Sequence, residues 1–442
     1  MARSIMNRTE EYANKLSLMI RKETISEEGQ QDKTKFYEFH ELMRELFPNV
    51  FSACEVEDFN ASLLLRWKGK GDGSPAMFMN HHDVVEAPGN WKNPPFDGKI
   101  EGGKLWGRGT LDDKGGLFAM LQAADELIAD GYVPKNDIYF ETACTEETDG
   151  SGADAVTSAL AERNIRFSFC LDEGGMVIYD PIGGVDGTFA MVGVGEKAFA
   201  DLKFIAKSNG GHASTPDKNT PLVRLGKFMA ACDRSNIFDV EMAEPVAEML
   251  RRMAPSMKAP LNKVLGQPEK FKTLLSAVMP AVSPAAGALL KTTLAFTMAQ
   301  GSAASNVLPQ EAYVIGNMRA SHHQGTDDSI KAVKKLAAKY DIEVEVVSRG
   351  VDSHLSSYRS DAFKLIEQAV GEFFKNVSTA PYIMTGASDS RYMSRVCDNC
   401  LRFTPFIIDQ DQLASIHGLN ENVDLSCLEP AVDFYKFIMN RL

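Results

Sequence analysis

The sequence predicts an α/β protein with a mostly parallel sheet covered by helices, into which a smaller α+β domain is inserted. Three observations support this prediction. The chain has 442 residues. A chain of this length exceeds what a single hydrophobic core usually supports, so two domains are expected. Short apolar runs alternate with helical patterns through the first half of the chain. Near residue 196 this pattern gives way to segments in which apolar and polar residues alternate.

The first half consists of buried-strand patterns separated by helical patterns. Its apolar runs are short and end in polar residues, whereas its longer segments repeat apolar residues at helical spacing. Gly131 marks the expected end of the first of these helices. Strand–helix alternation predicts right-handed crossovers and a largely parallel sheet, whose sites lie at the carboxyl ends of the strands. The predicted strands are residues 75–80, 137–144 and 167–175, and the predicted helices are residues 114–133 and 152–164.

The insertion is predicted to span residues 196–350, so that residues 1–195 and 351–442 form the two parts of the larger domain. Its strands alternate apolar and polar residues, as strands with one wet face do. A helix is expected between the last two strands, and residues 240–300 are interpreted as additional helices broken by prolines. The predicted strands are residues 197–208, 311–320 and 341–350, and the predicted helix is residues 328–340.

Composition and charge predict a soluble globular protein without a nucleic-acid or membrane partner. Lys and Arg number 47 and Asp and Glu number 60, which gives a net charge of −13, and no basic stretch offers contacts to phosphates. No apolar run approaches the roughly 20 residues that a bilayer span needs. Residues 1–16 are interpreted as an amphipathic start rather than a signal peptide. Seven scattered cysteines are expected to be reduced thiols, so a cytoplasmic location is the default expectation.

Ionisable side chains lie at four successive junctions between a predicted strand and the helix after it. Singly, each has a structural explanation, since strand ends are often polar and acidic helix starts favour the helix dipole. Together they would converge if the strands are parallel neighbours, and clustered carboxylates repel one another unless cations neutralise them. Imidazole and carboxylate ligands favour a zinc-type site, here a two-metal hydrolytic one. These side chains are His81, His82, Asp83, Asp112, Asp113, Glu146, Glu147, Asp172 and Glu173, with His417 near the C-terminus.

Eight short motifs occur in order along the chain. They are NHHDVV, WGRGTLDDKGG, TACTEETDGSG, LDEGG, GGHASTP, SNVLPQEAYVIGNMR, GASDSRYM and IHGLNENV. Over nearly the whole chain, this series resembles the zinc-dependent aminoacylase, carboxypeptidase S and succinyl-diaminopimelate desuccinylase superfamily of metallopeptidases. LDEGG, DSRYM and the helical insertion are most similar to carboxypeptidase S and its N-acyl-amino-acid hydrolase relatives. The resemblance implies a zinc-peptidase-like catalytic domain and an inserted ferredoxin-like lid and dimerisation domain.

The resemblance also implies two divalent metal ions. Zn²⁺ is expected, and Co²⁺ or Mn²⁺ are alternatives because availability decides occupancy as much as ligand type. Asp112 matches the bridging carboxylate, and Asp172 remains an alternative to Glu173 because relatives with a shorter acidic motif would use it. His82 is interpreted as structural. The implied metal ligands are His81, Asp112, Glu147, Glu173 and His417.

Two further residues are expected to act in catalysis. Glu146 matches the general base that takes a proton from metal-bound water and returns it to the leaving amine. Asp83 is expected to bond the second nitrogen of His81 and fix its tautomer. The Asp112–Asp113 peptide resembles one that is often cis, and Glu421 is expected to orient the loop behind His417.

The inserted domain is expected to contact the substrate. His212 resembles a histidine that, in dimeric relatives, reaches the partner's site and steadies the tetrahedral oxyanion, although a turn histidine is the structural alternative. Asn306 and Arg319 match a carbonyl- and carboxylate-binding pair, and an arginine fork suits a carboxylate. From the larger domain, Arg391 could bind the same carboxylate or could be structural. Gly386 is expected to let the backbone approach the ligand.

Together with the resemblance, these residues imply a di-zinc hydrolase that cuts the amide bond of small peptides with a free C-terminal carboxylate, as dipeptidases and carboxypeptidases do. It would use metal-bound hydroxide with a glutamate base and act as a homodimer. An N-acyl-amino-acid amidohydrolase, either an aminoacylase or a deacylase, is the alternative. Arg319 and Arg391 argue against an aminopeptidase, and the intact base argues against an inactive metal-binding scaffold. Glu86 replaces a proline of many relatives at the rim of the site, which leaves the substrate preference open.

Overall fold

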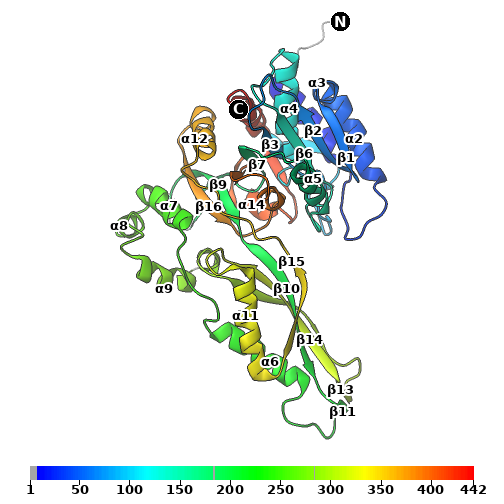
Figure 1. Ribbon diagram of the computed structural model, residues 1–442, viewed down its shortest axis with the longest axis vertical. Coiled ribbons are helices and arrows are strands. Elements are labelled where there is room, and N and C mark those ends of the chain that lie inside the picture. Colours follow the sequence, from blue (N-terminus) through cyan, green and yellow to red (C-terminus); the bar gives the residue numbers. More distant parts are fainter. Residues whose placement is uncertain (1–6, 183–184, 283) are drawn as a thin grey trace.

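The computed structural model describes residues 7–182, 185–282 and 284–442. Two bodies follow one another along the longest axis of the molecule (Figure 1). One body contains a large sheet covered by helices, together with the C-terminus, and the other is a small sheet with two helices that extends away from it. The chain passes from the large sheet to the small one between residues 196 and 198, where one strand ends and the next begins.

The larger body is built on a ten-stranded mixed sheet. Its strands are β1 (Glu55–Phe59), β2 (Ser62–Trp67), β3 (Ala76–Met79), β6 (Ile138–Thr142), β7 (Phe169–Asp172), β8 (Val177–Tyr179), β9 (Thr188–Glu196), β16 (Val377–Met384), β17 (Cys400–Arg402) and β18 (Ile407–Ile408). Their order is β1-β2-β6-β3-β7-β17-β9-β8-β18, with β16 paired to β9. The central strands β6, β3, β7 and β17 are parallel, whereas β1 and β2 pair antiparallel at one edge. The expected α/β class is therefore confirmed.

Helices cover both faces of the central strands, which is why β3, β6 and β7 are buried along their whole length. Successive residues of β3 point to opposite faces. Phe78 packs in a core with α1, α4, α12 and α15, whereas Met77 and Met79 pack with α5 and α13. These helices are α1 (Arg8–Ile20), α4 (Lys114–Ala129), α5 (Ser151–Glu162), α12 (Asp361–Phe373), α13 (Ser390–Met393) and α15 (Leu428–Met439).

Shorter elements complete this body. Gly131 follows α4 with φ +77°, a left-handed conformation that suits glycine and ends the helix where the sequence predicts.

Residues 1–6 of the predicted amphipathic start lie outside the described residues. Within the described chain, no helix is both long and apolar enough to cross a membrane. The remaining elements are α2 (Thr34–Leu46), α3 (Pro48–Ala53), α14 (Gln410–Ser415), and the small sheet of β4 (Lys99–Glu101), β5 (Lys104–Trp106) and β19 (Asn422–Asp424).

The smaller body, here called the lid, has the ferredoxin-like order of elements, strand–helix–strand–strand–helix–strand. These are β10 (Ala198–Lys207), α6 (Pro221–Arg234), β12 (Thr293–Gln300), β14 (Glu311–Ala320), α11 (Gly325–Ala337) and β15 (Glu343–Arg349). The antiparallel strands lie in the order β12-β14-β10-β15, and both helices pack on the sheet through one core. A two-stranded ribbon, β11 (Gly211–His212) and β13 (Val307–Leu308), forms the far tip of the lid (Figure 1).

The interpretation of residues 240–300 as helices within the inserted domain needs two corrections. The last part of this segment is strand β12, an edge strand of the lid sheet. The helices before it pack on β9 and β16 of the large sheet rather than on the lid sheet, through a separate core that includes Phe189, Met249 and Ile383. Prolines also stand near the starts of α7 and α10 rather than only breaking helices. These helices are α7 (Glu244–Met253), α8 (Leu261–Leu265), α9 (Lys272–Val282) and α10 (Pro284–Ala288).

Candidate active site

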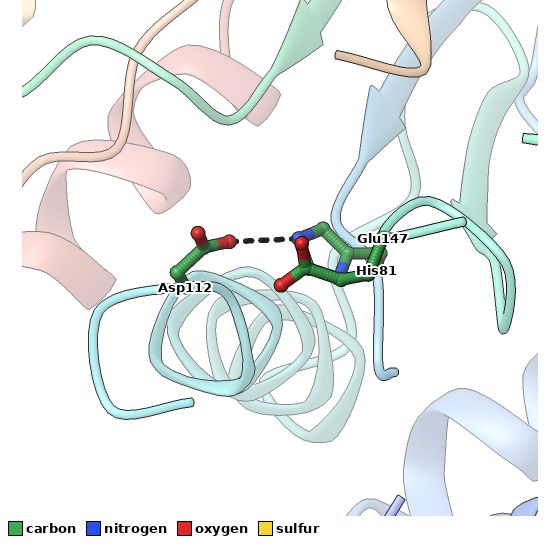
Figure 2. Close-up of side chains that lie close together, drawn as sticks. All are labelled: His81, Asp112 and Glu147. Atoms are coloured by element: carbon green, nitrogen blue, oxygen red, sulfur yellow. Dashed lines mark hydrogen bonds and ion pairs between the residues drawn. The ribbon is translucent and has the colours of Figure 1, made fainter. Parts of the chain in front are cut away.

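Three of the predicted metal ligands lie together at the carboxyl ends of the central strands. His81 follows β3, Asp112 precedes α4 and Glu147 follows β6, and one ligand atom from each lies within 4.8 Å of the others. Figure 2 shows the Asp112 carboxylate directed at the His81 ring, with Glu147 beside it. The distance from His81 Nε2 to Asp112 Oδ1 is 2.9 Å. The parallel sheet thus brings together ligands that are far apart in the sequence.

His417 joins this cluster from the C-terminal part of the chain. Its Nε2 lies 3.0 Å from Asp112 Oδ2 and 3.0 Å from Glu147 Oε2. Each oxygen of Asp112 therefore faces a different histidine, which is the arrangement that a bridging carboxylate needs. Bonds with Asp112 and Glu147 raise the pKa of His417 to about 10. Burial would raise the pKa of Asp112, but its bonds with His417 and His81 hold that pKa below its ordinary value.

Asp83 holds both the histidine and the loop that carries the two glutamates. His81 Nδ1 lies 3.0 Å from the backbone oxygen of Asp83 and 3.3 Å from its Oδ1. The backbone N–H groups of Glu146 and Glu147 donate to Oδ1 and Oδ2 of the same carboxylate, at 3.3 and 3.1 Å. With Nδ1–H donating to Asp83, Nε2 of His81 keeps its lone pair for a metal ion. Asp83 is buried completely, so these bonds are shielded from water.

Glu421 positions the loop that carries Asp112, whereas its expected role in orienting the loop behind His417 stays a prediction. Its Oε1 accepts the N–H groups of Leu111 and Asp112 at 2.8 and 3.2 Å, and its Oε2 accepts from Arg108 Nη1 at 2.7 Å. Glu421 is fully buried, so its charge depends on this arginine and these amides. The peptide between Asp112 and Asp113 is cis, as the sequence resemblance implies.

Glu146, the predicted base, lies against Arg391. The distance from Glu146 Oε1 to Arg391 Nη1 is 3.6 Å, and both side chains are nearly inaccessible to solvent. Burial raises the pKa of Glu146 to about 8, against the charges of His81 and Arg391, which lower it. Arg391 Nη1 also donates to the backbone oxygen of Ser388 at 2.8 Å. The structure thus places Arg391 beside the base.

The acidic pair after β7 divides into two different environments. Asp172 Oδ1 and Oδ2 accept the backbone N–H groups of Glu173 and Ser390, at 2.9 and 2.6 Å. For the Glu173 carboxylate, no hydrogen bond is found within residues 7–182, 185–282 and 284–442. Burial raises its pKa well above the ordinary value, as do the charges of Asp112 and Asp172. Asp172 is committed to the backbone, whereas the Glu173 carboxylate is free to bind a cation. The three-residue cluster at 4.8 Å does not include Glu173, so its role as a ligand stays a prediction.

The donor set fits divalent cations on chemical grounds. Burial raises the pKa of Glu147 to about 7, which shows the cost of holding these carboxylates charged without a cation. Glu147 Oε1 is buried and lacks a hydrogen-bond partner in the described part of the chain. Two imidazoles and several carboxylates are the ligands that zinc and similar ions take in catalytic sites. His81, Asp112, Glu147, Glu173 and His417 are therefore suited to hold metal ions.

Two of the predicted substrate contacts lie far from this cluster. His212 is in the exposed ribbon at the lid tip, where its Nδ1 accepts from Ser214 Oγ at 2.7 Å. Asn306 is exposed beside it, and its backbone oxygen accepts from Ala213 N–H at 3.0 Å. Figure 1 shows this tip at the opposite end of the lid from the large sheet. Within one chain, neither side chain reaches the metal ligands.

Arg319 lies at the other end of β14, near the large sheet, and its Nε donates to Asn317 Oδ1 at 3.1 Å. Strand β14 separates it from Asn306, so the predicted pair is divided by roughly 30 Å of extended chain at about 3.3 Å per residue and does not act together within one chain. Burial lowers the pKa of Arg319. The charges of Asp201 and Glu196 act in the opposite direction, whereas the charge of Arg391 lowers the pKa further. Gly386 lies in the exposed loop after β16, where an added Cβ would meet open space.

The structure also reveals a buried charged network that sequence reasoning missed. Arg402 Nε donates to Glu196 Oε2 at 2.9 Å, and the Ser388 N–H and hydroxyl donate to the same oxygen at 3.1 and 2.9 Å. Arg402 and Glu196 are 0% and 2% exposed. Neither residue falls within a polar cluster in the sequence, so no pattern indicates the pairing.

His82 is the residue for which the sequence favours a structural role. Its ring stacks on Phe39, and its Nδ1 shares a hydrogen bond with the Thr142 hydroxyl.

Comparison with known proteins agrees with this geometry. A family model described as Peptidase family M20/M25/M40 matches residues 77–441. The chain belongs to this family. The superfamily resemblance seen in the eight motifs is thereby confirmed, and the protein is a metal-dependent hydrolase that acts on amide bonds.

Three of the most similar known proteins illustrate the range of the family. The human N-fatty-acyl-amino acid synthase/hydrolase PM20D1 is 29% identical over 437 residues, which cover 97% of this chain and 87% of that protein. A probable carboxypeptidase S-like protein 2 of Dictyostelium discoideum is 29% identical over 425 residues, covering 93% and 80%. The M20 family metallo-carboxypeptidase Sso-CP2 of Sulfolobus solfataricus has the same fold, with a TM-score of 0.69, 15% identity and coverage of 98% and 99% of the two chains.

Proposed function

We propose that the protein is a two-metal hydrolase that cuts the amide bond of small peptides carrying a free C-terminal carboxylate. The observation that carries this proposal is the position of Asp112, whose two oxygens face His81 and His417 at 2.9 and 3.0 Å. One carboxylate between two histidines suits a pair of cations rather than one. Zinc is the expected metal, and cobalt or manganese would fit the same ligands.

The residues around the cluster each have a defined task in this reaction. When bound, the cations would polarise the amide carbonyl and acidify the attacking water. Glu146 would take the proton from that water at its carboxylate and pass it to the leaving amine. Arg391 would favour the ionised form of Glu146 and hold its carboxylate in place, because their side chains lie 3.6 Å apart in a buried setting. Asp83 would hold His81 and the glutamate loop in place.

Arg319 supports the part of the proposal that concerns the substrate carboxylate. It is a half-buried cation at the junction between the lid and the large sheet, and a guanidinium matches the geometry of a carboxylate. The nearby Arg391 is occupied by Glu146 and Ser388. Arg319 is therefore the side chain that we assign to the carboxylate of the substrate.

A homodimer and a cytoplasmic location belong to the same proposal. His212 and Asn306 are exposed at the lid tip and far from the metal ligands of their own chain, so a role in catalysis requires the site of a second copy. The cysteines are free thiols, as expected in a reducing compartment.

A second candidate function is hydrolysis of N-acyl amino acids. The name of the human relative, an N-fatty-acyl-amino acid synthase/hydrolase, favours it. Both substrate classes present a carboxylate next to the scissile amide, so Arg319 serves either one equally well. The two substrate classes differ in the group on the acyl side of the scissile amide, so recognition of that group distinguishes them.

The proposal is tested with zinc-loaded protein and four leucine derivatives: Gly-Leu, Gly-Leu amide, N-acetyl-leucine and N-oleoyl-leucine. Gly-Leu is expected to exceed its amide in kcat/KM by about 10- to 100-fold, the effect of one hydrogen-bonded charge. The Arg319→Ala variant should lose this preference through a higher KM, and Arg319→Lys should retain part of it. Equal cleavage of Gly-Leu and its amide by the wild-type protein would contradict the proposal.

A further inference from the structure

A row of polar side chains crosses the open face of the lid sheet, opposite the face that carries α6 and α11. Those helices cover Leu202 of β10 and Met318 of β14. Because side chains alternate along a strand, Asp201 and Asn317 point to the opposite face. The two are direct partners in the antiparallel pairing, and Asp201 is also paired with Ser348 of β15. Polar side chains from three neighbouring strands therefore meet in one row.

Hydrogen bonds connect this row to Arg319, which stands two residues after Asn317 and on the same face. Ser348 Oγ donates to Asp201 Oδ2 at 2.8 Å, and Asn317 Nδ2 donates to Asp201 Oδ1 at 2.7 Å. Arg319 Nε donates to Asn317 Oδ1 at 3.1 Å. Both oxygens of Asp201 and both ends of the Asn317 amide are thus used. We call these four residues the lid network.

The order of donors and acceptors in the lid network fixes the orientation of the Asn317 amide. A carboxylate only accepts hydrogen bonds, and a guanidinium only donates them. Asn317 must therefore present its NH₂ group to Asp201 and its oxygen to Arg319. All three side chains are half-buried, so water competes with these bonds less than it would at an exposed site.

The lid network holds Arg319 by its Nε and leaves its terminal groups, Nη1 and Nη2, open. For these two groups, no hydrogen bond or ion pair is found within residues 7–182, 185–282 and 284–442. Phe199 is the partner of Arg319 on β10, and its ring centroid lies 5.5 Å from the guanidinium carbon. Ordering a long side chain opposes ligand binding, and a side chain that is already held avoids most of that cost.

We infer that Asp201 and Asn317 are positioning residues for substrate recognition. They fix the plane of the Arg319 guanidinium, so that Nη1 and Nη2 together bind the two oxygens of the substrate carboxylate. This inference rests on the proposed function, which assigns Arg319 to that carboxylate. It adds that recognition requires an arginine held in advance by two residues that do not touch the substrate.

Gly-Leu and Gly-Leu amide test the inference, because they differ only in the carboxylate. In zinc-loaded protein, Asn317→Leu and Asp201→Leu should each raise the KM for Gly-Leu about five- to tenfold, as expected when a hydrogen bond to a charged group is weakened. The kcat and both constants for the amide should stay unchanged, since only carboxylate binding is affected. Asp201→Asn should keep most of the preference, because its side-chain oxygen still accepts from the Asn317 amide.

Two controls separate positioning from a general effect on the lid. Tyr313→Phe removes a hydrogen bond to Gln300 from the same face of β14 and should leave both KM values unchanged. In the Arg319→Ala background, Asn317→Leu should change neither KM further, because its effect acts through Arg319. Calorimetric titration of the zinc-loaded Glu146→Gln protein, with and without Asn317→Leu, should show the same loss in Kd for Gly-Leu without turnover.

The outcomes distinguish the inference from the proposed function. An unchanged KM for Gly-Leu in Asn317→Leu and Asp201→Leu, an equal loss for the amide, or a further loss in the Arg319→Ala background would overturn the inference while the proposed function stands. If the protein cleaves N-acyl-leucine rather than Gly-Leu, the same comparison is made with N-acetyl-leucine and its amide. Wild-type protein that cleaves neither acid faster than its amide would contradict both, since Arg319 would then bind no substrate carboxylate.

Discussion

Arg391 is the residue whose environment explains most about the proposed base. It belongs to the DSRYM motif, and a buried arginine needs a partner for its charge. The structure provides Glu146 at 3.6 Å and the Ser388 oxygen at 2.8 Å. A positive charge at this distance stabilises the ionised form of a carboxylate. Arg391 therefore opposes the burial that raises the pKa of Glu146.

Replacing Arg391 with Met should shift the pH dependence of the reaction. The base must be ionised to accept a proton, so activity falls as the pH drops through its pKa. Loss of the positive charge raises that pKa, and the acid limb of log(kcat/KM) against pH should move upward by about one unit. Arg391→Lys is the control and should shift the limb less. A variant with a higher KM and an unmoved acid limb would assign Arg391 to the substrate carboxylate instead.

At the residue scale, the sequence could identify the ligands but not all of their partners. His81 and Glu147 follow strands β3 and β6, Asp112 precedes α4, and the fold brings the three together as expected. The choice of Glu173 over Asp172 depends on hydrogen bonds from the Glu173 and Ser390 amides. Such bonds depend on the packing of distant segments, which no local pattern contains.

Among the secondary-structure elements, the passage from β9 to β10 links the catalytic sheet to the lid. Glu196 ends β9, and its carboxylate is held by Arg402 of β17 and by Ser388 of the loop before α13. Arg391 lies in α13, directly after that loop. The buried pair thus connects the start of the lid, the sheet and the residue beside the base. Lys197, the next residue, donates to the backbone oxygens of Ala288 and Lys291 and fixes the helical segment there.

Removing one partner of this pair should destabilise the fold strongly. Arg402→Met leaves the buried charge of Glu196 without its cation, which typically costs about 3–5 kcal/mol of unfolding free energy. The double variant Glu196→Gln, Arg402→Met should recover a large part of that loss. Urea unfolding of the zinc-loaded proteins measures both values.

An exposed ion pair provides the control for this prediction. Arg163 and Glu57 are 43% and 47% exposed and lie 2.6 Å apart, so Arg163→Met should cost less than about 1 kcal/mol. If Arg402→Met costs no more than Arg163→Met, the buried pair does not hold the junction as described.

Element types were easier to predict than their neighbours. The buried strands β3, β6 and β7 were recognisable because short apolar runs bounded by polar residues are typical of strands inside a parallel sheet. Strand β12 was missed because its apolar residues continue directly from a helical segment. The helices α7 to α10 were recognised, but helical periodicity indicates only that a face is buried. Periodicity does not indicate which sheet the buried face contacts, and here that sheet is the large one, at β9 and β16, rather than the lid sheet.

For the whole molecule, the separation of the lid tip from the lid base has the largest functional consequence. His212 and Asn306 lie at the tip, whereas Arg319 lies at the base, near the large sheet (Figure 1). One lid could therefore serve two sites, its own through Arg319 and that of a second copy through the tip. The resemblance implied such a role for His212 alone. The motifs could not reveal that Asn306 lies beside His212 and apart from Arg319, because distance along a sequence does not give distance in space.

The central claim is that Glu146 acts as the base of a two-metal amide hydrolase, and the Glu146→Gln variant tests it most directly. Wild-type and variant proteins are loaded with zinc, their metal content is measured, and hydrolysis of the best substrate is followed at pH 7. The expected result is two zinc ions per chain in both proteins and a kcat at least about a thousandfold lower in the variant, as expected when general-base catalysis is lost. Full metal content with nearly unchanged kcat would contradict the assignment of the base and the mechanism built on it.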